Sequence, residues 1–171
     1  PFTRRKDFVV RHSHGAYYFT SFVGPLSRLC GKKSLVKTSL ALNIARNVAV
    51  NQGDCVAIFS LEMSKESVTE RILSSESGVD SPYIRLRRVT EKDEAKIMEA
   101  SGLLSETAIY IDDSPQIQVI DIRSKAKRLQ FEHKIDLVII DYIQLISGSG
   151  RNENRVQELA KITRSLKIMA R

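Results

Sequence analysis

The chain has 171 residues, of which 42% are hydrophobic and 27% charged, a composition that predicts one globular domain with a single core. No apolar run approaches the roughly 20 residues that cross a bilayer, and the N-terminus lacks the apolar stretch of a secretory signal, so no membrane role is expected. Two cysteines, Cys30 and Cys55, are too few for a disulfide framework or a zinc cluster, and they predict free thiols in a reducing, cytoplasmic compartment.

The first helix is predicted at 37–53, where the regular part of the chain begins. Leu40, Ile44 and Val48 form its apolar stripe with Ala41 and Ala45 beside it, and Gly53 follows its end, where a left-handed cap is favoured. The next run, CVAIFS, is short, apolar and rich in strand formers. That composition predicts a strand at 55–60 that is buried on both faces.

Helices and strands continue to alternate along the rest of the chain. Ser64 is predicted to cap a helix that ends at Gly78, and Thr90 with Asp93 resembles a capping box before a helix through about Leu104. Strands are predicted at 108–112 and 135–141, with a helix between them. The apolar faces of the last two helices are predicted to hold Ile122, Ala126 and Leu129, and then Val156, Leu159, Ile162, Leu166 and Met169.

This order of elements predicts an α/β fold, with a parallel sheet and helices on both faces. Ligands of such sheets bind at the carboxyl ends of the strands. Those ends carry acidic side chains in this sequence: Glu62, Asp112, Asp113 and Asp141. The chain stops on a helix with no strand after it, so the fold is expected to be incomplete at the C-terminus.

The net charge of +7 is concentrated at the N-terminal end, because residues 1–38 contain eight Lys and Arg residues and one acid. An excess at one end predicts a solvated basic tail and is not evidence of a groove for nucleic acid. Residues 1–33 also hold six of the eleven aromatic side chains and follow no helical or strand period. We interpret 1–33 as an atypical segment, foreign to the domain or disordered.

A phosphate-binding loop is indicated by GKKSLVKTS at 31–39, which fits Gly, four residues, Gly, Lys and Ser or Thr at all fixed positions but one. Backbone N–H groups of such a loop wrap a phosphate at a helix N-terminus, Lys reaches the β- and γ-phosphates, and the hydroxyl binds Mg²⁺. Val36 stands where the second Gly belongs, and an ordinary Lys-Thr helix start is the alternative. The predicted nucleotide-binding residues are Gly31, Ser34, Val36, Lys37, Thr38 and Ser39.

Two acids complete the predicted site. Asp141 ends the apolar run LVIID and could hold Mg²⁺, usually through water, while Glu62 ends another strand and could deprotonate an attacking water. Either acid could instead face solvent, Glu62 simply before a helix that favours an N-terminal acid. In this order, loop, strand-Glu and strand-Asp predict a single site for a nucleoside triphosphate, Mg²⁺ and water.

The motifs resemble the C-terminal RecA-type ATPase domain of the DnaB-like replicative helicases, nearly continuously over 34–171. The family reads M-G-K-T-S/T-x-A-L-N-I-A where this chain reads LVKTSLALNIA. FSLEM and IYIDD recur unchanged, IDYIQL has Ile for the family's Leu, and the loop GSGRNENR with the helix after it is similar. The fold implied is a RecA-like P-loop NTPase, with 34–171 as a partial domain.

The resemblance also implies the roles of single residues. Lys37 and Thr38 would bind phosphate and Mg²⁺ of ATP, Glu62 would be the catalytic base and Asp141 a metal-associated acid. Gln144 would couple the nucleotide site to DNA. A loop facing the central channel would contact single-stranded DNA through Gly148, Ser149, Gly150, Arg151 and Arg155, a plain surface connection being the alternative.

The implied function is an ATP-driven DNA helicase motor that acts as a homo-hexamer, with ATP between subunits and a helicase loader and primase as partners. A recombinase or clock-type ATPase shares the fold, but FSLEM and IDYIQL argue against it. Val36 favours a third reading, an inactive RecA-fold remnant that binds a helicase or loader. The chain also ends before the family's arginine finger, so we expect little or no ATPase activity from it.

Residues 1–33 show no resemblance to the family, and the family's apolar strand before the loop is replaced by LSRLCGKK. A shifted reading frame or a fused gene remnant would explain both. Translation of the coding DNA in the other two frames tests this hypothesis, which requires one frame to encode a Gly-Asp-Leu-Ile-type strand.

Overall fold

The computed structural model describes residues 8–12, 15–19, 35–146 and 155–170, with backbone alone for 8–12, 15–19 and 35–37. Two short strands come first, and helices then alternate with three further strands. In chain order the elements are β1 (Phe8–His12), β2 (Gly15–Phe19), α2 (Leu35–Arg46), the π-helical turn η1 (Asn47–Asn51), β3 (Val56–Ser60), α3 (Lys65–Ser77), α4 (Ser81–Arg85), α5 (Glu91–Ser105), β4 (Ile109–Asp112), α6 (Val119–His133), β5 (Leu137–Asp141), the 3-10 turn η2 (Ile143–Leu145) and α7 (Arg155–Met169).

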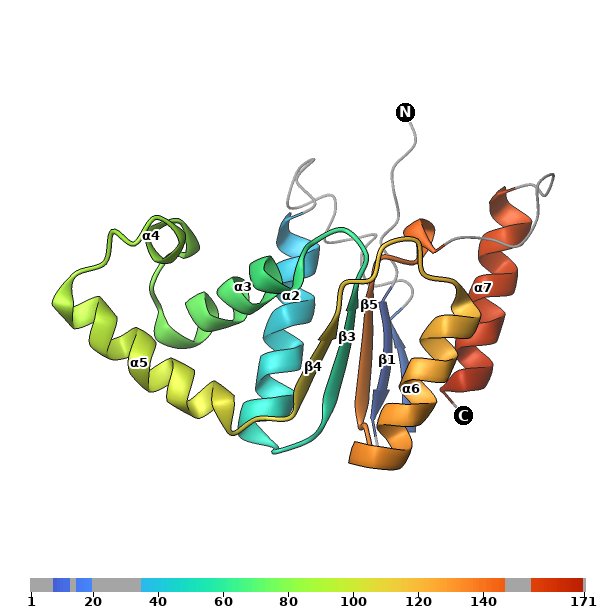
Figure 1. Cartoon of the computed structure of the whole chain (residues 1–171). Coiled ribbons are helices and arrows are strands. Elements are labelled where there is room, and N and C mark those ends of the chain that lie inside the picture. The colour runs from blue at the N-terminus through green and yellow to red at the C-terminus, as the bar shows by residue number, and fades with distance from the viewer. Residues whose placement is uncertain (1–7, 13–14, 20–34, 147–154, 171) are drawn as a thin grey trace.

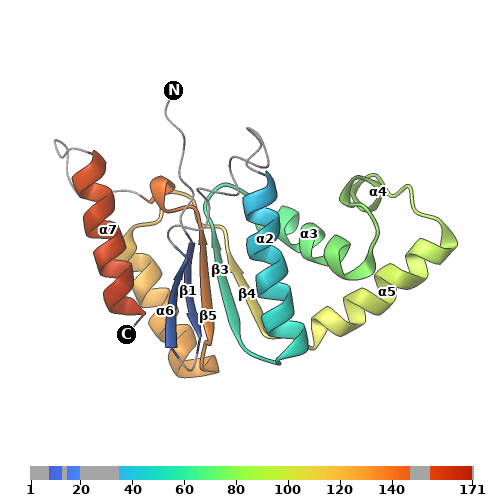
Figure 2. The same ribbon diagram turned by 180° about the vertical axis from the view of Figure 1, so that it is seen from behind.

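The central sheet is parallel and has the strand order β4-β3-β5. Helix α2 stands on one face of the sheet with α3 beside it, and α6 and α7 stand on the other face (Figures 1 and 2). No helix in the described ranges is long and apolar enough to cross a membrane. The layered architecture predicted from the alternation of elements is therefore confirmed.

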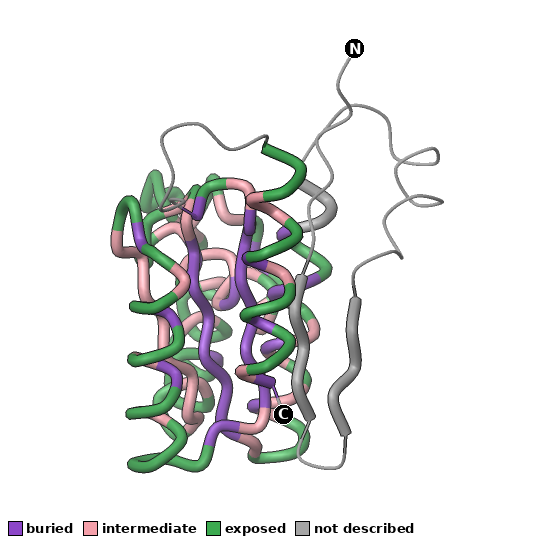
Figure 3. Tube along the Cα trace, turned by 90° about the vertical axis from the view of Figure 1, so that its right-hand side faces the viewer, coloured by how far each residue is buried: buried purple, intermediate pink, exposed green. Residues whose placement is uncertain are grey.

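Each face of the sheet has its own apolar core. Val56, Ile58, Leu137 and Ile139 point towards α2 and α3. The intervening strand residues, among them Ala57, Phe59, Val138 and Ile140, pack with α6 and α7. All ten residues of β3 and β5 are buried, whereas α2, α6 and α7 each combine buried and exposed residues (Figure 3). This two-sided burial explains why the strands are apolar without alternation.

Strands β3 and β5 are fastened together at both ends. At their start, Cys55 donates its backbone N–H to Asp136 Oδ2 (3.1 Å), and the N–H of Asp136 donates to the carbonyl of Cys55 (2.9 Å). At their end, the N–H of Leu61 donates to the carbonyl of Asp141 (2.8 Å). Ser60 is thereby the register partner of Asp141.

The buried side of α2 differs from the predicted stripe. Leu40 is 40% exposed, and Ile44 and Val48 are half-buried. The residues buried against the sheet are Ala41, Leu42, Ala45 and Ala49, while Ile44 and Val48 pack at the margin of the same cluster. Ala41 and Ala45, predicted beside the stripe, are therefore more deeply buried than the stripe itself. The prediction for α7 was also wrong at its first position, because Val156 is 72% exposed while Ile162 and Leu166 are buried.

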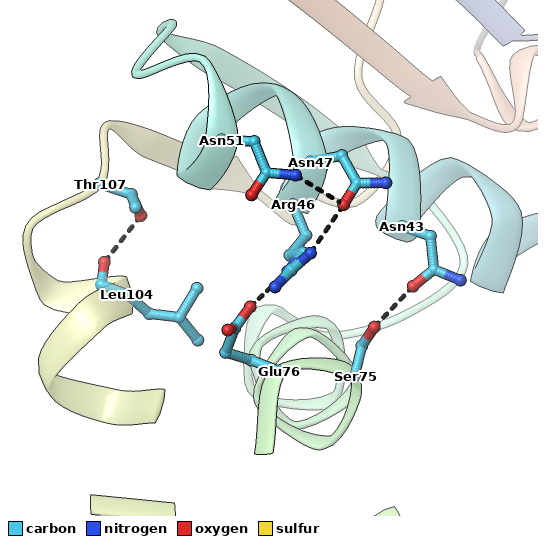
Figure 4. A network of polar contacts seen from close by, with 8 residues as sticks. All are labelled: Asn43, Arg46, Asn47, Asn51, Ser75, Glu76, Leu104 and Thr107. Atoms are coloured by element: carbon cyan, nitrogen blue, oxygen red, sulfur yellow. Dashed lines mark hydrogen bonds and ion pairs between the residues drawn. The ribbon is translucent and has the colours of Figure 1, made fainter. Parts of the chain in front are cut away.

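Polar contacts join the end of α2 to α3 (Figure 4). The Arg46 guanidinium forms an ion pair with Glu76, and Ser75 donates its hydroxyl to Asn43 Oδ1 (2.6 Å). The Glu76 hydrogen bond raises the pKa of Arg46, which burial alone would lower. The helix that contains Thr38 is therefore tied to the helix that follows Glu62.

Helix ends match the sequence where a cap was predicted. The Ser64 hydroxyl accepts from the N–H of Ser67, Gly78 has a positive φ of 69°, and Thr90 forms a capping box with Asp93. Helix α4 was not predicted. Its end is closed by bonds from Arg87 N–H to the Ile84 carbonyl (3.2 Å) and from Arg88 N–H to the Tyr83 carbonyl (3.0 Å), with Arg87 in the left-handed region (φ 52°). That bond pattern is a Schellman motif, in which Gly is the usual residue at the left-handed position.

The segment 1–33, in which no strand was predicted, contains the antiparallel pair β1 and β2, with Phe8 opposite Phe19. Strand β1 lies beside β5 (Figures 1 and 2). The remaining residues of 1–33 lie outside the described part, so their foreign origin stays a hypothesis.

Candidate nucleotide-binding site

Thr38 and Asp141 meet at the carboxyl edge of the sheet, although 103 positions separate them in sequence. The Thr38 hydroxyl donates to Asp141 Oδ2 at 2.6 Å, and the two residues are only 6% and 5% exposed. Thr38 lies in the first turn of α2, where N–H groups lack helical partners and favour an anion. Asp141 is the last residue of β5. The predicted metal ligands from the loop and the strand are thus brought together.

Glu62 lies at the same edge of the sheet, on the adjacent strand end. It follows Leu61, whose N–H is bonded to the carbonyl of Asp141, and it is exposed. Ser60 turns the chain at this point, because its hydroxyl donates to the carbonyl of Met63 (2.7 Å). The predicted base and the predicted metal-associated acid therefore occupy neighbouring positions with solvent access for a ligand.

The acids at the end of β4 have structural partners. Lys125 Nζ lies 2.5 Å from Asp112 Oδ2 and 2.8 Å from Ser114 Oγ, which ties α6 to the edge strand. Burial raises the pKa of Asp112, but the hydrogen bonds from Lys125 and Ser114 outweigh it and hold the pKa below its usual value. Asp113 accepts from the N–H of Lys65 (3.0 Å) at the start of α3. These contacts tie α6 and the start of α3 to the end of β4.

Several predicted site residues cannot be placed. Gly31, Ser34 and the loop residues Gly148, Ser149, Gly150 and Arg151 lie outside the described ranges. Val36 and Lys37 belong to the first turn of α2, with no description of their side chains, and Ser39 is exposed on the same helix. The backbone at Val36 is helical, so Val does not occupy a left-handed position there.

Gln144 and Arg155 are brought together although neither was predicted to touch the other. Arg155 opens α7, and its Nη2 donates to the main-chain carbonyl of Gln144 in η2. Its Nη1 forms an ion pair with Glu158. Neither this contact nor the one between Lys125 and Asp112 was predicted from the sequence. The spacing of Arg155 and Glu158, three residues apart at a helix start, is the one signal that could have indicated a pair.

The residues at the sheet edge fit a bound Mg²⁺ with nucleotide. A hydroxyl and a carboxylate 2.6 Å apart are oxygen donors of the kind that Mg²⁺ prefers, and a helix N-terminus beside them favours phosphate. Within the described ranges no group of three or more His, Cys, Asp or Glu side chains gathers as a metal cage. Mg²⁺ usually keeps waters and substrate phosphates among its ligands, so a two-residue contribution suits it.

Residues 23–171 match the family described as the DnaB-like helicase C terminal domain. The chain belongs to the DnaB-like helicase C-terminal domain family. The match begins at residue 23, so the prediction that residues 1–33 show no resemblance to the family was wrong for 23–33.

Replicative helicases of bacteria are among the relatives of this DnaB-like chain. The replicative DNA helicase DnaB of Geobacillus stearothermophilus is 47% identical over 144 residues, which are 84% of this chain and 32% of that protein. The replicative DNA helicase DnaC of Bacillus subtilis is 46% identical over 144 residues, with the same two shares. The DnaB-like chain thus spans about a third of the length of these relatives.

Solved structures show the same fold. One that is described as an ATPase domain superposes with a TM-score of 0.74 at 31% identity, covering 81% of this chain and 50% of that one. A DnaB-like replicative helicase, described with its interactions with primase, gives a TM-score of 0.75 at 31% identity over 82% of this chain and 34% of that one. The fold of this DnaB-like chain is therefore RecA-like, as the motifs predicted.

Proposed function

We propose that this chain is the nucleotide-binding part of a replicative DNA helicase motor, in which ATP hydrolysis drives movement along single-stranded DNA and unwinding of the duplex. The contact between Thr38 and Asp141 is the observation that carries the proposal. It joins the start of a helix to the end of a strand at the sheet edge where nucleotides bind in parallel α/β folds. Membership of the DnaB-like family supplies the substrate class.

The chain's own residues divide the work of phosphoryl transfer. The N–H groups of the first turn of α2 and the Lys37 ammonium would hold phosphate, and Gly31, Ser34, Val36 and Ser39 would complete the cradle. Glu62 would orient the attacking water and accept its proton. Thr38 and Asp141 would hold Mg²⁺, which when bound neutralises charge on the β- and γ-phosphates.

The parts of the chain that would meet DNA lie beyond η2. Gln144 would couple the nucleotide site to DNA. The loop with Gly148, Ser149, Gly150 and Arg151 would contact the phosphate backbone of the single strand. A homo-hexamer with ATP between subunits, in the cytoplasm, is the assembly proposed. A helicase loader and primase are the proposed partners, the latter supported by the structural relative described with primase.

Binding of ATP tests the nucleotide site directly. Equilibrium titration with a fluorescent ATP analogue should show saturable, Mg²⁺-dependent binding by the chain, which Thr38→Val abolishes. Thr69→Val is the matched control, because Thr69 on α3 is exposed and bonds only locally to the Lys65 carbonyl (2.8 Å). Binding that persists without Mg²⁺ and in Thr38→Val would contradict the proposed site.

Val36 supports a second candidate, an inactive remnant that binds a helicase or loader without turnover. A Cβ with two branches stands where the loop pattern has Gly, close to where a phosphate would lie. Val36→Gly should raise ATP affinity if the rest of the cradle is sound. No nucleotide binding by either form, with a partner protein still bound, would favour the remnant over the motor.

A further inference from the structure

Arg155, the first residue of α7, is hydrogen-bonded to the backbone carbonyl of Gln144, three residues after Asp141. Arg155 Nη2 donates to the carbonyl of Gln144, and Nη1 is paired with Glu158 Oε2 on the next turn of the helix. The Glu158 side chain is 17% exposed and that of Arg155 is 48% exposed. The Arg155 guanidinium is thus paired through Nη1 with a largely buried carboxylate, and it donates through Nη2 to η2.

The carbonyl of Gln144 is available for this bond. Within η2 the described backbone bonds run from Leu145 N–H to the Tyr142 carbonyl (3.0 Å) and from Ile146 N–H to the Ile143 carbonyl (3.2 Å). These bonds use the two preceding carbonyls and not that of Gln144. A charged donor from α7 therefore takes an acceptor that the turn itself does not use, and such charge-assisted bonds are about twice as strong as neutral ones.

Helix α7 is packed against the same core as η2. Ile162 and Leu166 are buried in the same apolar cluster as Ile143, the first residue of η2, and Ile146, the residue after η2. The side chain of Arg155 spans from this packed helix to the turn. It thus adds a polar tie to an apolar contact between the same two elements.

We propose that Arg155 is a positioning residue rather than a ligand of DNA phosphate. Glu158 orients its guanidinium, which fixes the backbone of Gln144, three residues after Asp141. The inference rests on the proposed function, because it takes Gln144 as the residue that couples the nucleotide site to DNA. It changes the role assigned to Arg155 from the motif and leaves Arg151 as the phosphate ligand.

Glu158 separates the two roles because they predict opposite effects. If Arg155 binds phosphate, Glu158 competes with the phosphate, so Glu158→Gln strengthens DNA binding. If Arg155 positions Gln144, Glu158 holds the guanidinium in place, so Glu158→Gln weakens DNA binding. The change removes a charge and keeps the shape of the side chain.

The carbonyl carbon resonance of Gln144 reports the contact in the whole chain. It should move in Arg155→Ala and in Glu158→Gln, move less in Arg155→Lys, which keeps a charged donor, and stay in place in Arg164→Ala. Arg164 is an exposed arginine of the same helix. Amide resonances of β3 and β5 verify that each variant is folded. A Gln144 carbonyl resonance that is the same in wild type, Arg155→Ala and Glu158→Gln overturns the inference.

Salt dependence of binding to a single-stranded oligothymidine provides the functional readout. Loss of one phosphate contact reduces the slope of log affinity against log salt by about 0.7 for a single strand. We expect that reduction for Arg151→Ala, and for Arg155→Ala a weaker affinity with an unchanged slope. A slope reduced by about 0.7 in Arg155→Ala, or tighter binding by Glu158→Gln, overturns the inference. A wild-type chain that binds no oligothymidine contradicts the proposed function, while the carbonyl resonance still decides the role of Arg155.

Discussion

Replacement of Thr38 by Val removes one hydroxyl from the carboxyl edge of the sheet and alters little else. Val has nearly the shape of Thr and a similar helix propensity, so effects on the helix are small. The hydroxyl lies 2.6 Å from Asp141 Oδ2, and the two residues are 6% and 5% exposed. Water cannot readily replace a donor lost at such a place.

The magnitude follows from that geometry. A hydrogen bond to a charged group contributes about 1.5–3 kcal/mol of stability. Loss of the Thr38 hydroxyl should cost this whole contribution, because water cannot rehydrate the buried Asp141 carboxylate. We expect Thr38→Val to lose about 1.5–3 kcal/mol of unfolding free energy. In a chain of this size each kcal/mol lowers Tm by about 2–4 °C. Urea unfolding followed by far-UV circular dichroism measures the loss.

Three comparisons give the measurement its meaning. Thr69→Val, at an exposed position, should change stability by no more than about 0.5 kcal/mol. Thr38→Ser keeps the hydroxyl and should retain most of the stability. Combined with Asp141→Asn, Thr38→Val should add less than it does alone, because the two side chains share one bond. If Thr38→Val is no more destabilising than Thr69→Val, the reasoning from this contact is refuted.

Two more predictions concern backbone conformation and pH. Arg87→Gly should stabilise the chain by roughly 0.5 kcal/mol, because Gly adopts the left-handed φ of 52° without strain, although its greater freedom in the unfolded state offsets part of the effect. Arg85→Gly, within α4, should destabilise the chain. Chemical denaturation measures both changes. The lowered pKa of Asp112 means that its contribution to stability is present above the unfolded pKa of about 3.9 and is lost as the pH falls towards the folded value. Wild type should therefore lose more stability than Lys125→Met between about pH 5 and pH 2, while Lys127→Met, two residues along the helix, should follow wild type. An equal loss in Lys125→Met would contradict this reading of the ion pair.

Much of the fold could be predicted because the strands and caps are local signals. The runs that end at Ser60 and Asp141 are apolar on both faces, and Gly78 ends its helix in the expected left-handed conformation. The buried side of α2 could be predicted only in part, because hydrophobicity alone favours Leu40, which is 40% exposed, over Ala45, which is fully buried. Close approach of a helix to a sheet reverses that preference, and it is a property of the packed structure.

The candidate site was predictable in its parts and not in its contacts. Sequence order placed Thr38 and Asp141 at helix and strand ends, and parallel topology then brings those ends to one edge. The side-chain pairing of Arg155 with the Gln144 carbonyl depends on how α7 packs against η2, which no motif encodes. The motif distinguished Asp141 from Asp112, but only the structure shows that Asp141 lies beside Thr38 and that Asp112 is paired with Lys125.

The bonds between Cys55 and Asp136 have a consequence for a site at the other end of the sheet. A strand that is apolar on both sides can slip by one residue with little change in hydrophobic contact, so the sequence of β5 says little about its own alignment. The carboxylate of Asp136 specifies the register, because it accepts a hydrogen bond from the N–H of Cys55 just before β3. Five residues later, about 16 Å along the strand, Asp141 arrives level with Ser60. Asp141, the acid that we propose to hold the metal, is therefore aligned by a side chain at the opposite end of the sheet.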